Sequence, residues 1–218
     1  MENLQRPKLD PTLYLVTDST GLTEEEFLSR VEQACRGGVT LLQLREKERS
    51  GREYLSLAQK VKAIADLYRI PLLIDDRADI ALAVDAAGVH VGQSDLPVSV
   101  ARRLLGPNKL VGATAKTVPQ ALEAQAQGAD YLGVGAIFPT TTKVITVLTK
   151  VETVCEICRV VRIPAVAIGG LNAENLSVLS QCPVGGVAVV SAIMKQADPE
   201  SAARSLKQAV LALRGESV

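Results

Sequence analysis

The stretch Tyr131-Leu-Gly-Val-Gly-Ala-Ile-Phe-Pro-Thr-Thr-Thr-Lys143 passes directly from an apolar segment into a polar one. Its first half consists of apolar residues and glycine, a composition typical of a buried strand. Its second half offers three hydroxyl groups and one ammonium group, which together suit an anion and above all a phosphate. Threonines in a loop also bond their own backbone without binding a ligand, so the stretch alone leaves both interpretations open.

The same succession of apolar strand, polar connection and amphipathic window recurs along the whole chain. We expect strands at residues 13–17, 40–44, 70–74, 88–91, 110–113, 131–134, 165–168 and 187–190. We expect helical segments at residues 24–36, 53–68, 78–84, 99–105, 119–127, 151–161, 174–180 and 200–213.

This alternation of strands and helices with short connections favours a closed α/β barrel of the (β/α)8 type. We expect a single TIM-barrel domain over residues 1–218, with residues 1–10 as an N-terminal extension. The alternative is an open, doubly wound sheet. That fold would need a glycine-rich fingerprint after the first strand, and the segment Thr17-Asp-Ser-Thr-Gly21 lacks one.

Composition and charge limit the possible partners. Apolar residues make up 47% of the chain and aromatic residues 3%, so leucine, valine, isoleucine and alanine must fill the core. The formal net charge is zero, which argues against a nucleic-acid partner but allows small anionic substrates. No apolar run is long enough to span a bilayer and residues 1–10 lack the apolar core of a signal peptide. We therefore expect a cytoplasmic protein without a membrane partner; the sequence indicates no oligomeric state.

The chain has four cysteines: Cys35, Cys155, Cys158 and Cys182. The pair in Cys155-Glu-Ile-Cys158 has the spacing of a metal or redox motif, but no second pair accompanies it. We interpret both as ordinary helix residues, and we expect all four thiols to be reduced.

Charged side chains are expected where the second, third and fourth strands end, at the face of a barrel that carries active sites. Gln43, Arg45 and Lys47 alternate along an extended chain, so they should share one side, and both cations suit oxyanions. Asp76 and Asp95 follow neighbouring strands and could hold one Mg²⁺ ion together. The alternatives are a solvated charged loop and, for the aspartates, caps for the helices that follow.

Four further segments are expected at the same face of the barrel. They supply hydroxyls, cations and close backbone amides, and they are Thr114–Thr117, Thr140–Lys143, Gly169-Gly170 and Val190-Ser191. Phosphate sites after the seventh and eighth strands recur in this fold. The single histidine, His90, lies within a strand, where a structural role is favoured over catalysis. No Ser-His-Asp or Cys-His arrangement is evident, so we expect no protein nucleophile.

Several segments together resemble one enzyme family. In chain order they are Tyr14-Leu-Val-Thr-Asp18, Gln43-Leu-Arg-Glu-Lys47, Asp76-Arg77, Gly88-Val-His-Val-Gly-Gln-Ser-Asp95-Leu-Pro, Gly128-Ala-Asp-Tyr-Leu-Gly-Val-Gly, Phe138-Pro-Thr-Thr-Thr-Lys143, Ala167-Ile-Gly-Gly170 and Val189-Val-Ser-Ala-Ile193. The set resembles thiamine phosphate synthase, also called thiamine-phosphate pyrophosphorylase, from about residue 13 to residue 193.

The resemblance implies a transferase of thiamine biosynthesis with a (β/α)8 fold. It would join 4-amino-5-hydroxymethyl-2-methylpyrimidine diphosphate to a thiazole ethyl phosphate, or its carboxylated form, with Mg²⁺-assisted release of pyrophosphate. By the family pattern, the pyrimidine diphosphate would contact Gln43, Arg45, Lys47, Asp75, Thr114 and Lys143. The thiazole phosphate would contact Thr140, Thr142, Gly170, Val190 and Ser191. Mg²⁺ would bind Asp76 and Asp95, while Arg45, Lys47 and Lys143 would act catalytically by stabilising the leaving group.

The chain departs from the family pattern at three places. Asp75 stands where the family usually has asparagine, and an ionised carboxylate cannot donate a hydrogen bond. Thr114-Ala-Lys116 replaces Ser-Ala-His, and we favour charge compensation of Asp75 by the metal or by Lys116. Residues 144–149 are more apolar than expected beside such a site, as either a closing flap or the start of a helix.

Two other functions of related type remain as alternatives. A thiazole tautomerase of the same fold would dispense with the metal pair and the Thr-Thr-Thr-Lys segment, and it would want a histidine near position 116. A non-catalytic binding protein of the thiamine pathway is supported only by Asp75.

Overall fold

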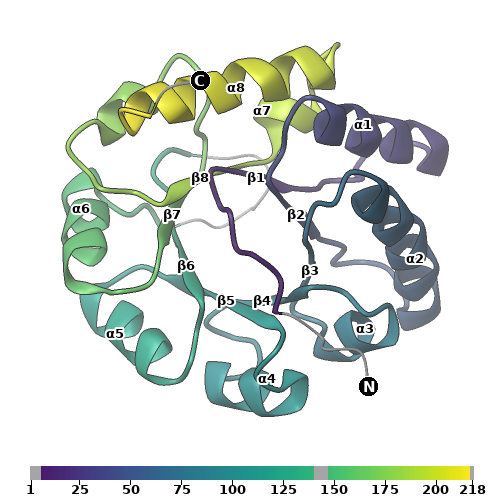
Figure 1. Cartoon of the computed structure of the whole chain (residues 1–218), viewed down its shortest axis with the longest axis horizontal. Helices are drawn as coiled ribbons and strands as arrows, with labels where there is room; N and C mark the ends of the chain where they lie inside the picture. The colour runs from purple at the N-terminus through teal and green to yellow at the C-terminus, as the bar shows by residue number, and fades with distance from the viewer. Residues whose placement is uncertain (1–5, 140–146, 217–218) are drawn as a thin grey trace.

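Parallel strands form a closed barrel in the computed structural model, which describes residues 6–139 and 147–216. The strands are β1 (Leu13–Val16), β2 (Leu41–Leu44), β3 (Leu72–Asp75), β4 (Gly88–Val91), β5 (Leu110–Ala115), β6 (Tyr131–Gly135), β7 (Ala165–Ile168) and β8 (Gly186–Val189). Each strand pairs with the next and β8 pairs with β1, which closes the ring in Figure 1. The predicted (β/α)8 fold is confirmed.

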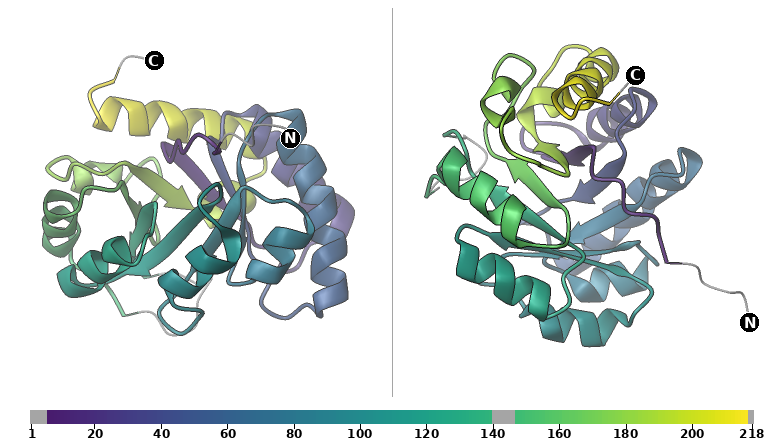
Figure 2. Two further views of the ribbon diagram at one scale, coloured as in Figure 1. Left: turned by 60° about the horizontal axis from the view of Figure 1, so that its bottom comes forward. Right: turned by 60° about the vertical axis from the view of Figure 1, so that its left-hand side comes forward.

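Helices surround the barrel on the outside (Figures 1 and 2). They are α1 (Glu24–Arg36), α2 (Gly51–Leu67), α3 (Ala78–Ala83), α4 (Val98–Leu105), α5 (Val118–Ala126), α6 (Val151–Val160), α7 (Ser191–Met194) and α8 (Pro199–Leu213), with the 3₁₀ turn η1 (Leu176–Leu179). Both α1 and α2 begin with a capping box, formed by Thr23 with Glu26 and by Ser50 with Glu53. These reciprocal bonds satisfy the first free amides of each helix, which explains why the two helices begin there.

The helical segment predicted at residues 174–180 is only the 3₁₀ turn η1. The Asn172 side-chain oxygen accepts hydrogen bonds from the Glu174 and Asn175 amides, and the Asn175 side chain accepts one from the Asn172 amide. Such local bonds compete with helix formation. The short helix α7 follows β8 directly and carries Ser191 at its first position.

Apolar side chains form two layers, one on each side of the barrel wall. Leu13 and Leu15 of β1 belong to the outer layer, between strands and helices, whereas Tyr14 belongs to the inner one. The inner cluster consists of Tyr14, Val16, Leu41, Leu73, Leu110, Tyr131, Val166 and Ala188. Because successive side chains alternate between the two faces, the residues two and four places beyond Leu41 also face inward, toward the carboxyl end of the barrel.

The amino-terminal segment crosses the opposite mouth of the barrel (Figure 1). Leu9 packs against the inner cluster, and Arg6 pairs with Asp130, which directly precedes β6. A hollow of about 880 Å³ lies at this end, and two of its four cations, Lys62 and Lys109, are each paired with an aspartate. Among the helices that the structure describes, none combines the length and apolar character needed to cross a membrane.

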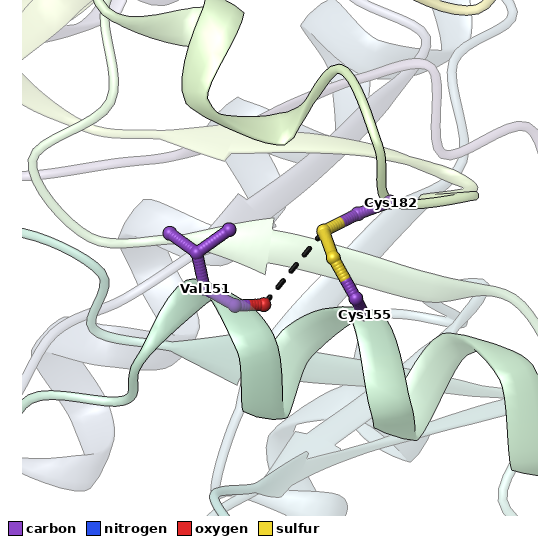
Figure 3. The surroundings of a disulfide bond; sticks show 3 residues. All are labelled: Val151, Cys155 and Cys182. Carbon is purple, nitrogen blue, oxygen red and sulfur yellow. Dashed lines mark hydrogen bonds between the residues drawn. A yellow bond between two sulfur atoms is a disulfide. The ribbon is translucent and has the colours of Figure 1, made fainter.

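A disulfide bond joins Cys155 of α6 to Cys182, which lies between η1 and β8 (Figure 3). The expectation of reduced thiols is therefore wrong for these two residues. Their Cα atoms lie 4.5 Å apart although 27 positions separate them in sequence, so only the folded barrel brings them together. The Cys182 sulfur also lies 3.7 Å from the Val151 carbonyl oxygen, a contact without a proton because a disulfide sulfur carries none. Cys35 and Cys158 are free, so the Cys155–Cys158 spacing forms no redox pair.

Candidate active site

Positive and negative side chains meet where β2 and β3 end. The Lys47 ammonium group lies 3.0 Å from Asp75 Oδ2 and also pairs with Asp76. Arg45 Nε lies 3.8 Å from Asp75 Oδ2, too far for a hydrogen bond but close enough for an ion pair. Arg45 and Lys47 thus reach the same carboxylate, as their alternation in the sequence predicts. The solvated-loop alternative for the segment from Gln43 to Lys47 is wrong for Gln43, which is 3% exposed, whereas Lys47 is exposed and paired with the aspartates.

Asp76 and Asp95 lie next to each other beyond β3 and β4. Asp76 has a φ of 59°, in the left-handed region, and its amide donates to the His90 carbonyl oxygen at 2.8 Å. Asp95 Oδ2 accepts a hydrogen bond from the Gly92 amide at 2.8 Å. In the described structure, neither α3 nor α4 is capped by a side chain. The capping alternative is therefore wrong for both aspartates.

Crowded carboxylates shape the electrostatics of this corner. Burial raises the pKa of Asp76 to about 6, with further contributions from the charge of Asp75 and the adjoining Asp95 carboxyl group; the pair with Lys47 opposes the rise. Burial lowers the pKa of Lys47, but the charges of Asp76 and Asp75 outweigh this effect and hold the pKa above its usual value. Close carboxylates that resist ionisation are a setting in which a divalent cation adds stability.

The donor set has the composition that Mg²⁺ prefers. Within residues 6–139 and 147–216, no cluster of three or more histidine, cysteine, aspartate or glutamate side chains could hold a metal alone. Two carboxylates are sufficient for Mg²⁺ where substrate phosphate and water supply the remaining oxygens. Asp76 and Asp95 therefore fit this ion together with a phosphorylated substrate.

A chain of polar side chains crosses the barrel interior below these charges. Gln43 Nε2 donates to the Tyr14 hydroxyl at 2.5 Å, and the Tyr14 and Tyr131 hydroxyls lie 2.8 Å apart. His90 Nδ1 lies 2.8 Å from the Tyr131 hydroxyl, and His90 Nε2 lies 3.0 Å from Thr114 Oγ1. Both ring nitrogens of His90 are thus satisfied within the protein, in agreement with the predicted structural role.

The sequence alone did not identify Tyr14 and Tyr131 as members of this hydrogen-bonded group. The signal was present in two glycines of neighbouring strands: a Cβ at Gly112 would lie 2.1 Å from the Tyr131 ring, and one at Gly133 would lie 3.2 Å from His90 Cε1. Glycine at these inward positions leaves room for the rings. Burial raises the pKa of both Tyr14 and Tyr131 and lowers the pKa of His90, so all three side chains remain uncharged.

The ends of β7 and β8 form a second corner of the same face. Gly169 and Gly170 have φ values of 105° and 66°, and a Cβ at Gly170 would lie 2.6 Å from Phe138 Cβ. Val190 immediately precedes α7, and Ser191 begins it. A short helix after β8 is the element that completes phosphate sites in many such barrels. The predicted Thr140, Thr142 and Lys143 lie outside the described residues.

Lys116 does not occupy the place expected for it. Its ammonium group donates to the Val147 carbonyl oxygen at 3.2 Å, while the cations that pair with Asp75 in the described structure are Lys47 and Arg45. Charge compensation of Asp75 by Lys116 is therefore wrong, because Lys47 already supplies it. Of the apolar segment at 144–149, residues 147–149 precede the helix α6, and the earlier ones lie outside the described residues.

Known proteins match most of this chain. Residues 13–193 match the family model described as thiamine monophosphate synthase. Thiamine-phosphate synthase 2 of Streptococcus pneumoniae serotype 4 is 56% identical over 189 residues, which cover 87% of this chain and 90% of that protein. The thiamine-phosphate synthase of Enterococcus faecalis is 57% identical over 84% of this chain and 86% of that protein. The solved structure of a thiamine phosphate pyrophosphorylase from Pyrococcus furiosus is 36% identical, with a TM-score of 0.85 over 94% of this chain and 97% of that one.

Proposed function

This chain belongs to the thiamine monophosphate synthase family and is a transferase, and we propose that it joins 4-amino-5-hydroxymethyl-2-methylpyrimidine diphosphate to thiazole ethyl phosphate or its carboxylated form. The products would be thiamine phosphate and pyrophosphate. The observation that carries this proposal is the group formed by Arg45, Lys47, Asp76 and Asp95 at the strand ends. Such a group suits a leaving group that gains negative charge.

The diphosphate end of the pyrimidine substrate would lie against the β2–β4 corner. Arg45 and Lys47 would neutralise the pyrophosphate as the bond to carbon breaks, together with Lys143. Asp76 and Asp95 would hold Mg²⁺, which supplies further charge neutralisation when it is bound. Lys47 would then exchange part of its pairing with the aspartates for pairing with phosphate oxygens. This description requires no protein nucleophile.

The thiazole substrate would be held by its phosphate group at the β7–β8 corner. The backbone of Gly170 and Val190 and the Ser191 hydroxyl would bind the phosphate, with Thr140 and Thr142 from the segment after β6. Gln43, Asp75 and Thr114 would contact the pyrimidine substrate between the two corners. The arrangement would bring the thiazole nitrogen toward the carbon that loses pyrophosphate.

The decisive experiment is pyrophosphate release from the purified chain. We expect release to require both substrates and Mg²⁺, and we expect thiamine phosphate to form in equal amount. Asp85→Asn serves as the control for the variant Asp76→Asn. Asp85 has a φ of 50°, in the left-handed region like Asp76, but it pairs with Lys109 at the opposite end of the barrel. Isomerisation of a thiazole carboxylate phosphate without pyrophosphate release would favour the tautomerase alternative, and binding without turnover would favour the binding protein.

A further inference from the structure

The hydrogen-bond chain inside the barrel joins two residues of the proposed pyrimidine site that lie on different strands. We propose that the hydrogen bonds of this chain all run one way: both tyrosine hydroxyls donate toward His90, and His90 donates to Thr114. The Thr114 proton is then left free for the substrate. Tyr14, Tyr131 and His90 are then positioning residues. The inference rests on the proposed function only for the identity of the substrate that Thr114 meets.

The hydrogen-bond chain is continuous, and all of its side chains except the partly exposed Thr114 are buried. It runs from Gln43 of β2 through Tyr14 of β1, Tyr131 of β6 and His90 of β4 to Thr114 of β5, with successive separations of 2.5, 2.8, 2.8 and 3.0 Å. Tyr14 and Tyr131 are 2% and 0% exposed. Water therefore has little access to the two hydroxyls, and each must find its partners within the chain.

With the Gln43 amide oriented as in the structure, counting protons determines the direction of the hydrogen bonds. Gln43 directs its amide nitrogen at Tyr14, so the Tyr14 oxygen accepts and its own proton is available only for Tyr131. Tyr131 in turn donates to His90 Nδ1, which must be unprotonated. A neutral imidazole then carries its proton on Nε2, which donates to Thr114 Oγ1. The opposite direction would require the Gln43 amide to turn over so that its oxygen accepted the Tyr14 proton, against the orientation in the structure; without that turn the Tyr14 proton would be buried and unpaired.

The consequence lies at Thr114. Its hydroxyl accepts from His90 and makes no other hydrogen bond among the described residues, so its proton remains for a ring nitrogen or a phosphate oxygen. If the chain ran the other way, the same proton would be held by His90 and Thr114 could only accept. The buried tyrosines therefore decide whether a residue at the mouth acts as a donor or as an acceptor.

The single histidine makes the direction measurable. Protein labelled with ¹⁵N in histidine should show one imidazole, and its two nitrogen shifts report which nitrogen carries the proton. We expect a neutral ring protonated at Nε2 in the native protein, without substrate. A ring protonated at Nδ1, or a charged ring at neutral pH, would overturn the proposed direction. This measurement is independent of whether the proposed reaction occurs.

A double-mutant cycle tests the transmission to Thr114. Tyr131→Phe removes one hydroxyl from the chain and Thr114→Val removes its end. We expect each to raise KM for the pyrimidine diphosphate roughly three- to tenfold, with a smaller effect on KM for the thiazole phosphate. The two effects should not add, because the Tyr131 hydroxyl no longer has a Thr114 hydroxyl to orient once Thr114 is replaced.

The controls separate positioning from packing. Tyr68→Phe also removes a tyrosine hydroxyl, which donates to Glu32 over 3.0 Å and lies away from the site. This variant should leave both KM values unchanged. Thr114→Ser keeps the hydroxyl and should keep the coupling with Tyr131→Phe. Additive effects of Tyr131→Phe and Thr114→Val on KM would contradict the proposal. If the native chain fails to turn over these substrates, the proposed function fails, while the histidine spectrum still decides the direction.

Discussion

Asp75 shows how one residue can depart from its family pattern without disrupting a site. An extra carboxylate beside a bound pyrophosphate is unfavourable unless a cation compensates for it. Lys47, at 3.0 Å, and Arg45, at 3.8 Å, provide that compensation from the neighbouring strand. From the sequence, either the metal or Lys116 was expected to compensate for this charge. Lys116 is wrong, because it is directed to the Val147 carbonyl oxygen, and compensation by the metal stays a prediction.

The variant Asp75→Asn should move the acidic limit of activity. The charge of Asp75 is one reason why the pKa of Asp76 rises to about 6, after burial itself. Removing that charge should lower the pKa of Asp76, so the variant should keep its activity to lower pH than the native protein. The measurement is kcat/KM against pH at a limiting Mg²⁺ concentration. An acidic limb at the same pH in both proteins would show that Asp75 does not act on Asp76.

The variant Asp76→Asn should stabilise the protein without metal and prevent stabilisation by metal. A carboxyl group whose pKa is raised on folding binds more protons folded than unfolded, so its effect on stability worsens as pH rises from about 4 to about 6. At neutral pH without Mg²⁺, we expect Tm to increase by roughly 2–4 °C, the shift that about 1 kcal/mol gives in a chain of this size. Asparagine also tolerates the left-handed backbone at this position.

Thermal unfolding with and without Mg²⁺ checks this expectation. The native protein and the Asp85→Asn control should both gain stability from Mg²⁺, whereas Asp76→Asn should gain none. A Tm for Asp76→Asn that is lower than native without metal would contradict the electrostatic account.

At the scale of single elements, the carboxyl ends of β7 and β8 depend on close backbone approach. Gly170 is in the left-handed region and faces Phe138 so closely that a Cβ would lie 2.6 Å from Phe138 Cβ and 3.0 Å from the Pro139 carbonyl oxygen. Strand positions and the glycine pair were predictable from sequence, because hydrophobic periodicity and turn residues are local signals. The helix α7 and the turn η1 were not, because their lengths depend on side-chain bonds around Asn172 and on packing.

The variant Gly170→Ala should separate the two substrates. The added methyl group would push against the segment after β6, so we expect KM for the thiazole phosphate to rise about tenfold or more and KM for the pyrimidine diphosphate to change less. Gly106→Ala is the matched control, since Gly106 has a φ of 73° but nothing within 4 Å of an added Cβ. Equal increases in both KM values would contradict the proposed division of the site.

At the scale of the whole molecule, the barrel was predictable and its internal connections were not. Alternating strands and helices with short connections admit few closed arrangements, so the fold followed from the pattern. The disulfide and the Tyr14–Tyr131 contact join residues 27 and 117 positions apart. No local sequence pattern predicts such a contact, because the two residues meet only once the barrel has formed.

Removing the disulfide should destabilise the fold. In the chain-entropy model, a cross-link across 27 positions is worth about 3–4 kcal/mol. We expect the double variant Cys155→Ser/Cys182→Ser to unfold roughly 6–15 °C below the native protein. Cys158→Ser, which removes a free cysteine from the same helix, should change Tm by much less. Equal melting of the native protein with and without a reducing agent would contradict a stabilising role for the bond.

The bond between Cys155 and Cys182 also encloses a covalent ring, and the whole of β7 lies inside it. One cut of the backbone within the ring, for example beside the exposed Glu174, would therefore leave the molecule as a single covalent piece. Nicked protein should migrate as an intact chain on a gel without reductant and separate into two fragments when reductant is added. After such a cut the fragment that carries β8 and α8 would stay covalently attached to α6 through Cys182, whereas without the bond only non-covalent packing would hold it.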